Sequence, residues 1–168
     1  PFAQELTVGF DSLAVFQMPD GSLPFQFAHL LPAVLAESYA IAGNSGLFHT
    51  PELLGGFALL AFFVLAWRLL RRPLFALSAM LALAFLLPEV SFSRDSYSEI
   101  PSQILLFTAL WMLVSPRVLP RWRAALVGGL FLGALEATRI DAVVFLIGVP
   151  GVCALAWLRA EAGERRRT

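Results

Sequence analysis

The sequence predicts an all-α fold: a polytopic transmembrane helical bundle of about five spanning helices, preceded by an N-terminal interfacial or re-entrant helix. Three observations predict it. Hydrophobic residues make up 58% of the 168 residues and charged residues 14%, whereas a soluble domain is usually about half apolar and about a quarter charged. Long apolar runs recur without the alternation of a β-barrel strand. The arginines gather at alternate ends of successive runs, as in membrane proteins.

Five apolar runs approach the roughly 20 residues that a helix needs to cross a bilayer. They lie at about 53–70, 74–92, 100–114, 124–137 and 142–158. The shorter runs are expected to include polar neighbours or to tilt against partner helices. Residues 51–159 are therefore predicted to form a transmembrane core. Within it, Gly55–Gly56 and the GxxxG pattern of Gly129 and Gly133 predict close helix packing.

The two ends of the chain are more polar than this core. Residues 1–50 are predicted to be the remainder of an extracytoplasmic loop with an amphipathic helix over about 27–43, ended by the GNSG turn at 43–46. Pro32 and Glu37 fit an interfacial helix, and a short buried span is the alternative. Residues 160–168 are predicted to be a basic cytoplasmic tail or loop that meets anionic lipid headgroups. Because the chain starts at Pro1 without a visible signal peptide, we expect it to be a piece of a longer protein.

The arginines predict the orientation of the spans. Ten of the 12 basic residues, all of them arginine, follow the first, third and fifth runs, and the positive-inside rule makes these ends cytoplasmic. Residues 1–50, 91–101 and 136–141 are then predicted to face outside. Arg94 and Arg139 are the two arginines of these outer segments. The predicted localisation is an integral membrane protein, with membrane lipids as partners.

The outer segments also hold the residues that could carry chemistry. Residues 91–103 read SFSRDSYSEIPSQ, the densest polar cluster of the chain. In the LEATRIDA turn, fewer than five residues separate two apolar runs, which places Arg139 and Asp141 at the membrane boundary. Ionisable groups held at that depth are costly and tend to be paired or functional. An arginine–aspartate pair that only fixes the topology is the alternative.

Particular roles follow from the side-chain types. Arg94 and Arg139 are candidate phosphate ligands, because the planar guanidinium fork matches phosphate oxygens. Asp95, Glu99 and Asp141 are candidate catalytic acids that could orient an arginine, bind a divalent metal or help to deprotonate a hydroxyl.

Further residues are expected to line the same cleft, namely His29, Tyr97 and Ser98. No HExxH, CxxC or close histidine pair is present, so a zinc site is not indicated. No Walker loop or GxGxxG is present either, and no nucleic-acid partner is expected. The sequence thus indicates no definite cofactor, with a divalent metal as an open alternative.

Two stretches together resemble the GT-C superfamily of membrane glycosyltransferases. The first, LPEVSFSRDSYSEIPSQILLF, carries an "R…SE" element, and the second, GGLFLGALEATRIDAVVF, carries a "G…L…TR.DA" element. The residues concerned are Arg94, Ser98 and Glu99 in the first and Gly133, Leu135, Thr138, Arg139, Asp141 and Ala142 in the second. The chain is most similar to the branch near the protein mannosyltransferases and aminoarabinose transferases.

This resemblance implies an activity. It implies an enzyme of the bacterial cell envelope that moves a sugar from a polyprenyl-phosphate donor to an extracytoplasmic acceptor. Basic residues would hold the donor phosphate, and an acid of the first external loop would act as a base or orient a metal. Asp11 and Asp20 match no such motif. A non-catalytic membrane subunit of a larger complex and a transporter fragment are the alternative functions.

Overall fold

The computed structural model describes residues 30–94, 97–115 and 120–165. Within these ranges the chain is all-α, as predicted, with six α-helices and one short 3₁₀ helix. The elements are α2 (Leu30–Leu70), α3 (Pro73–Ala84), α4 (Leu87–Arg94), α5 (Glu99–Val114), α6 (Arg121–Leu135), η1 (Ile140–Ala142) and α7 (Val143–Arg165).

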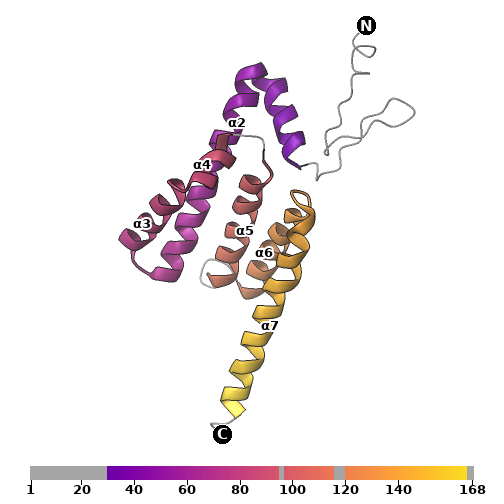
Figure 1. The fold of residues 1–168 in the computed structure, drawn as a ribbon. Coiled ribbons are helices and arrows are strands. Elements are labelled where there is room, and N and C mark those ends of the chain that lie inside the picture. Colours follow the sequence, from indigo (N-terminus) through magenta and orange to yellow (C-terminus); the bar gives the residue numbers. More distant parts are fainter. Residues whose placement is uncertain (1–29, 95–96, 116–119, 166–168) are drawn as a thin grey trace, which may run out of the picture.

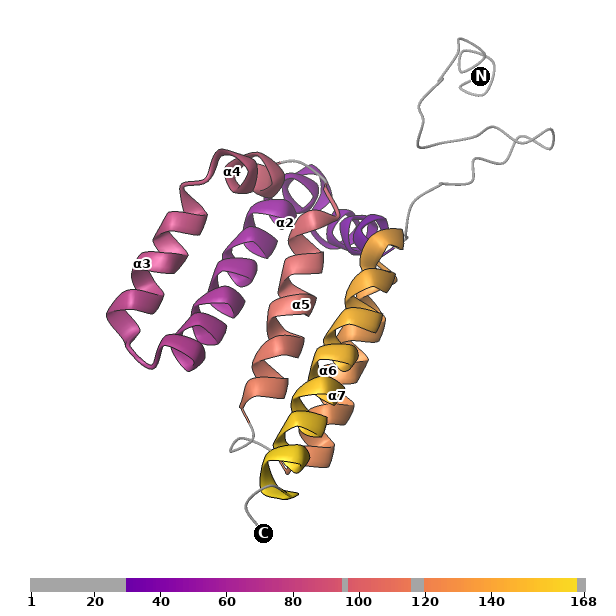
Figure 2. The same ribbon diagram turned by 60° about the horizontal axis from the view of Figure 1, so that its bottom comes forward.

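The helices form a row rather than a closed bundle. α3, α2, α5 and α6 lie side by side in that order, and α7 lies against α6 (Figure 2). α4 lies across the middle of α2, beside Gly55, at one end of the row (Figure 1). This end of the row also holds the first turn of α5 and the turn between α6 and α7, whereas the turn between α2 and α3 lies at the opposite end. The two polar segments singled out by the sequence therefore share one end of the molecule.

α2 joins the predicted N-terminal helix to the first predicted span. Gly43 has φ 60° and ψ −145°, a left-handed conformation that interrupts the helix. The GNSG turn therefore ends the first helical segment as predicted. Residues 44–70 then continue as a helix roughly 40 Å long at 1.5 Å per residue. The first apolar helix thus begins well before residue 53, because the polar residues after Gly43 are helical too.

The segment predicted as one span over 74–92 is broken into two helices in the structure. α3 ends at Ala84, α4 begins at Leu87, and the two are bent by 68°. Pro88 explains the break, because it has no N–H to donate to the carbonyl of Ala84 and its ring would clash with that carbonyl. Among the described residues, one helix, α2, is long and apolar enough to cross a membrane, or two if the bent pair counts as one. The other apolar helices are shorter.

α5 is the central element, packed between α2 and α6. Small side chains allow the helices to approach, and Ala58 of α2 and Ala109 of α5 are fully buried. The rings of Phe62 and Phe107 pack with centroids 5.2 Å apart across the α2–α5 contact. At the far end, Arg68 donates from Nε to the carbonyl of Val114 at 3.1 Å, which satisfies an otherwise free acceptor at the C-terminus of α5.

The glycine of α6 that packs against α5 is not a member of the predicted GxxxG pair. A Cβ added at Gly128 would lie 3.3 Å from Cγ of Leu113 on α5. A Cβ at Gly129 or Gly133 would meet no atom within 4 Å. The pattern therefore predicted close packing on the right helix but on the wrong face, since GxxxG does not say which side of the helix meets the neighbour.

Gly55 provides a test of the α2–α4 contact. An added Cβ would lie 2.7 Å from Cβ of Ser93, closer than carbon atoms pack. We expect Gly55→Ala to destabilise the protein by about 1–3 kcal/mol through overpacking, seen as a lower midpoint of thermal unfolding in detergent. Gly56→Ala is the matched control, because its Cβ would meet nothing within 4 Å. Equal midpoints for the two variants would contradict this packing.

Candidate functional site

The turn after α6 fixes the backbone on which the site is built. The carbonyl of Leu135 accepts the N–H of Thr138 at 2.9 Å and that of Arg139 at 3.1 Å, so the chain closes tightly after the last helical residue. Arg139 is extended, with φ −152° and ψ 139°, and the η1 turn follows it. The N–H of Leu30 donates to the carbonyl of Ala137 at 3.1 Å, so the beginning of α2 lies against the same turn.

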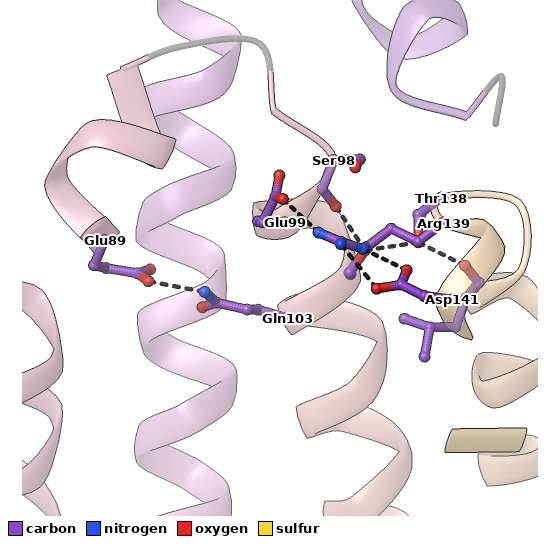
Figure 3. A network of polar contacts seen from close by, with 9 residues as sticks. Glu89, Ser98, Glu99, Gln103, Thr138, Arg139 and Asp141 are labelled. Carbon is purple, nitrogen blue, oxygen red and sulfur yellow. Dashed lines mark hydrogen bonds and ion pairs between the residues drawn. The ribbon is translucent and has the colours of Figure 1, made fainter. Parts of the chain in front are cut away.

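Arg139 joins this turn to the first turn of α5. Its Nε donates to Oδ1 of Asp141 at 2.7 Å, and its Nη2 donates to Oδ2 of the same carboxylate at 2.9 Å. Its Nη1 donates to Oε1 of Glu99, which lies 40 positions earlier in the chain (Figure 3). One guanidinium is thus held by two carboxylates, one in a bidentate pair and one on a neighbouring helix. Such charge-assisted bonds are stronger than neutral ones and fix the orientation of the fork.

The cluster changes the protonation behaviour of its members. The hydrogen bonds from Arg139 hold the pKa of Asp141 below its usual value, and burial opposes this only in part. Conversely, the bond to Asp141 is the main reason why the pKa of Arg139 is raised; burial lowers it, and Glu99 adds to the increase. Arg139 and Asp141 then both carry their charges at neutral pH.

A pair of hydroxyls forms a second link between the same two segments. Thr138, which is buried, donates from Oγ1 to the carbonyl of Leu135 at 2.6 Å. Its Oγ1 also lies 2.7 Å from Oγ of Ser102, and Ser102 lies 2.6 Å from the carbonyl of Ser98. Each hydroxyl has one hydrogen to donate, so two hydrogens serve three contacts. Whenever one hydroxyl donates to the other, the contact links the end of α6 to the start of α5, and one of the two carbonyls loses that donor.

A third polar contact lies on the other side of α5. Glu89 of α4 is 5% exposed and accepts a hydrogen bond from Nε2 of Gln103 at 2.8 Å. Oε1 of Glu89 and Oε1 of Gln103 are both buried and have no hydrogen-bond partner among the described residues. Figure 3 shows Gln103 between Glu89 on one side and the Arg139 cluster on the other.

A pocket of about 270 Å³ opens between α5 and the start of α7. Its exposed lining is mainly apolar, with a small polar part, so it is suited to a ligand with a large apolar portion. The lining residues are Glu99, Ser102, Gln103, Leu106, Leu135, Arg139, Asp141, Ala142 and Phe145.

Three of the residues singled out by the sequence meet here, namely Glu99, Arg139 and Asp141. Three others lie on the adjoining segment without lining this pocket. Arg94 is the exposed last residue of α4, and Tyr97 packs edge-on against Phe92 with ring centroids 5.4 Å apart. Ser98 contributes its carbonyl to Ser102. The predicted Asp95 and His29 lie outside the described residues.

Sequence reasoning missed three members of the site. Ser102 and Gln103 follow Glu99 at i+3 and i+4, a spacing that places all three on one face of a helix, so periodicity could have found them. Glu89 is an acid inside the otherwise apolar LLPEV stretch, which is itself a signal of a paired or functional group. Its partner could not be read from the sequence, because the contact depends on the bend between α3 and α4.

A divalent metal does not fit this pocket. The carboxylates that would have to ligate it, Glu99 and Asp141, both accept bonds from a guanidinium, and that positive charge opposes a second cation. In residues 30–94, 97–115 and 120–165, no group of three or more His, Cys, Asp and Glu could hold a metal ion.

Comparison with known proteins finds no matching family model, curated protein or solved structure. What the pocket can bind follows from its own chemistry. It combines an arginine paired with two carboxylates and a largely apolar wall.

The lowered pKa of Asp141 predicts a pH dependence. A carboxylate whose folded pKa lies below its unfolded value, 3.8, stabilises the fold above that value and loses this contribution as the pH falls through the folded pKa. The side chain is 62% exposed, so we expect less than about 1 kcal/mol. The thermal midpoint of the wild type should exceed that of Asp141→Asn at pH 6, and the difference should shrink towards pH 3. A difference that is constant over this range would contradict the ion pair.

Proposed function

We propose that the chain is part of an integral membrane glycosyltransferase of the bacterial cell envelope. This enzyme moves a sugar from a polyprenyl-phosphate donor to an extracytoplasmic acceptor. One observation carries the proposal: the two sequence elements that resemble this class of enzyme meet in space. Glu99 of the first element and Arg139 of the second form an ion pair at the mouth of one pocket. Antiparallel packing of α5 and α6 already brings these two ends together, and the ion pair adds a specific link between the two elements.

The exposed surface supports a membrane location with several spans. Large apolar side chains are exposed in α3, in the link to α4 and in α4, with Leu74 76%, Phe85 82% and Leu87 81% exposed. The same holds for α7, with Ile147 70% and Val152 68% exposed. Monomeric soluble proteins rarely expose contiguous apolar surface on this scale. Lipid tails around the row of helices would cover it.

The pocket suits a phosphate linked to both a sugar and a lipid chain. The apolar wall, with Leu106, Leu135 and Phe145, can hold the first isoprene units. Arg139 uses three of its five N–H groups for the carboxylates, so two N–H groups on the terminal nitrogens stay available for a phosphate oxygen. Asp141 is a poor proton acceptor because its pKa is lowered, and it therefore acts by orienting the guanidinium.

A second candidate function is a non-catalytic membrane subunit. The observation that favours it is the same cluster, since all three guanidinium nitrogens already bond to carboxylates. In that case Arg139 would only tie α5 to the turn between α6 and α7. The two candidates make different predictions for sugar transfer.

The membrane orientation can be tested with single cysteines. In a Cys153→Ser background, Tyr97→Cys reports on the end that carries the cluster, and Pro120→Cys on the opposite end of α6; both positions are exposed. We expect a membrane-impermeant maleimide to label Tyr97→Cys in intact cells and to label Pro120→Cys only after permeabilisation. The physical reason is that arginine-rich ends remain in the cytoplasm. Labelling of both variants in intact cells would contradict the orientation.

The activity can be tested through the geometry of the arginine fork. Arg139→Lys keeps the charge but cannot form the bidentate contact. We expect it to reduce sugar transfer from a polyprenyl-phosphate donor by about 10-fold or more, equivalent to about 1.4 kcal/mol. The measurement uses membrane vesicles that contain the full-length protein, with a panel of radiolabelled donors.

Arg123→Lys is the matched control for this experiment. Arg123 lies at the other end of α6, over the ring of Trp122 at 5.0 Å, and its replacement should leave transfer nearly unchanged. Size-exclusion profiles of tagged protein show whether each variant is still folded. No transfer by the wild type from any donor, or full transfer by folded Arg139→Lys, would refute the enzyme and favour the subunit.

A further inference from the structure

The turn between α2 and α3 consists of two exposed arginines, Arg71 and Arg72. It lies at the end of the row opposite the Arg139 cluster (Figure 1). Residues 53–88 and 100–135 contain no aspartate or glutamate, so the ends of α2, α3, α5 and α6 that meet here carry no counter-charge. Within the described residues, neither guanidinium of the turn is paired with a carboxylate. Two uncompensated cations therefore stand side by side at this end.

The backbone of Arg71 adopts a conformation that arginine does not favour. Its φ is 56°, in the left-handed region, where the Cβ of an L-residue comes too close to the following carbonyl oxygen. Its N–H donates to the carbonyl of Trp67 at 2.9 Å, so Arg71 closes the end of α2, a position at which glycine is the usual residue. Arg72 is extended, as expected for a residue before proline. The turn thus keeps an arginine where glycine would fit with less strain, and that arginine gains no carboxylate partner in return.

The surface on both sides of the two arginines is apolar. Leu69 and Leu70 precede them, Leu74 and Phe75 follow them, and these four side chains are between 49% and 76% exposed. The guanidinium fork matches the oxygens of a phosphate, but a soluble phosphate would leave the apolar side chains in water. Acyl chains would cover them. An anionic phospholipid offers the phosphate and the acyl chains in one molecule, and it therefore fits this surface better than a soluble anion does.

We infer that Arg71 and Arg72 form a binding surface for the phosphate group of an anionic glycerophospholipid in the leaflet at this end of the row. The start of α3 adds to it, because this helix has no side-chain cap and the free N–H groups of its first turn form the positive end of the helix dipole. The number of arginines predicts only the orientation of the chain, whereas this surface binds lipid at one turn. It requires the proposed membrane location but not sugar transfer.

The strain at Arg71 allows a test with a variant that is more stable than the wild type. We expect Arg71→Gly to raise the thermal midpoint of the full-length protein in phosphatidylcholine nanodiscs by about 2–4 °C, because glycine adopts the left-handed conformation freely. Phosphatidylglycerol added to the nanodiscs should raise the midpoint of the wild type, since a ligand of the folded state stabilises it, and should raise that of Arg71→Gly much less. A lower midpoint of Arg71→Gly in pure phosphatidylcholine would overturn the inference, because it would mean that an intramolecular contact holds the arginine.

The lipid beside the turn is measured through the fluorescence of Trp67. This side chain is 49% exposed and lies one helical turn before Arg71, so brominated acyl chains next to the turn would quench it. In full-length protein with Trp67 as the only tryptophan, we expect brominated phosphatidylglycerol to quench with a preference of about 3- to 5-fold over brominated phosphatidylcholine, because each arginine near an anionic membrane surface contributes a factor of about five. The double variant Arg71→Gly/Arg72→Gln should remove this preference.

Arg123→Gln is the matched control, because it removes one arginine from the same end of the row but on α6, on the far side of α5 (Figure 2). We expect it to leave the preference at Trp67 nearly unchanged. A loss as large as that caused by Arg72→Gln would show a diffuse effect of charge and overturn the site.

The remaining outcomes separate this site from the proposed function. If excess glycerol phosphate in solution abolishes the preference, the ligand is a soluble anion and the lipid site is overturned. Equal quenching by the two lipids would overturn the lipid site alone and leave the membrane location and the transferase standing. Absence of quenching by either lipid would refute the membrane location, and with it both the lipid site and the proposed function.

Discussion

The ion pair between Arg139 and Glu99 is the contact on which the polar end of the molecule depends. It joins α5 to the turn between α6 and α7, and it needs Asp141 to hold the other side of the guanidinium. If Arg139 were absent, two carboxylates would face each other without a cation at the end of an apolar row of helices, where like charges raise each other's energy. The Ser102–Thr138 contact lies beside it and keeps the same two segments in register.

Because of the cluster, one side of the pocket differs in chemistry from the rest. Spare N–H groups of Arg139 offer hydrogen-bond donors, and Leu106 and Phe145 offer apolar surface. A ligand with an anionic group and a hydrocarbon chain would use both. A ligand with only one of these parts would leave at least one wall unmatched, and this difference in fit is the basis of selectivity.

The sequence predicted the local features of this structure better than the contacts between residues far apart in the chain. Apolar runs predict helices because each run must satisfy its backbone internally, and the short LEATRIDA turn pointed to Arg139 and Asp141. Glu99 was predicted to be an acid that could orient an arginine, but its pairing with Arg139 was not predicted, since nothing in the periodicity of either run links residues 40 positions apart. The face of α6 that packs against α5 could not be predicted either. Gly128 and Gly129 are adjacent in the sequence, and only Gly128 meets a neighbouring helix.

The bend between α3 and α4, which the sequence did not predict, explains the contact between Glu89 and Gln103. That contact was not predicted either. A straight helix over 74–92 would run antiparallel to α2 along its length and carry its last residues past the end of the row. Pro88 stops α3 and lets α4 turn by 68° across α2 and towards α5. Only then can the carboxylate of Glu89, the next residue, reach Gln103 and accept its hydrogen bond at 2.8 Å. The proline therefore determines through the backbone which side chain of α5 the neighbouring acid meets.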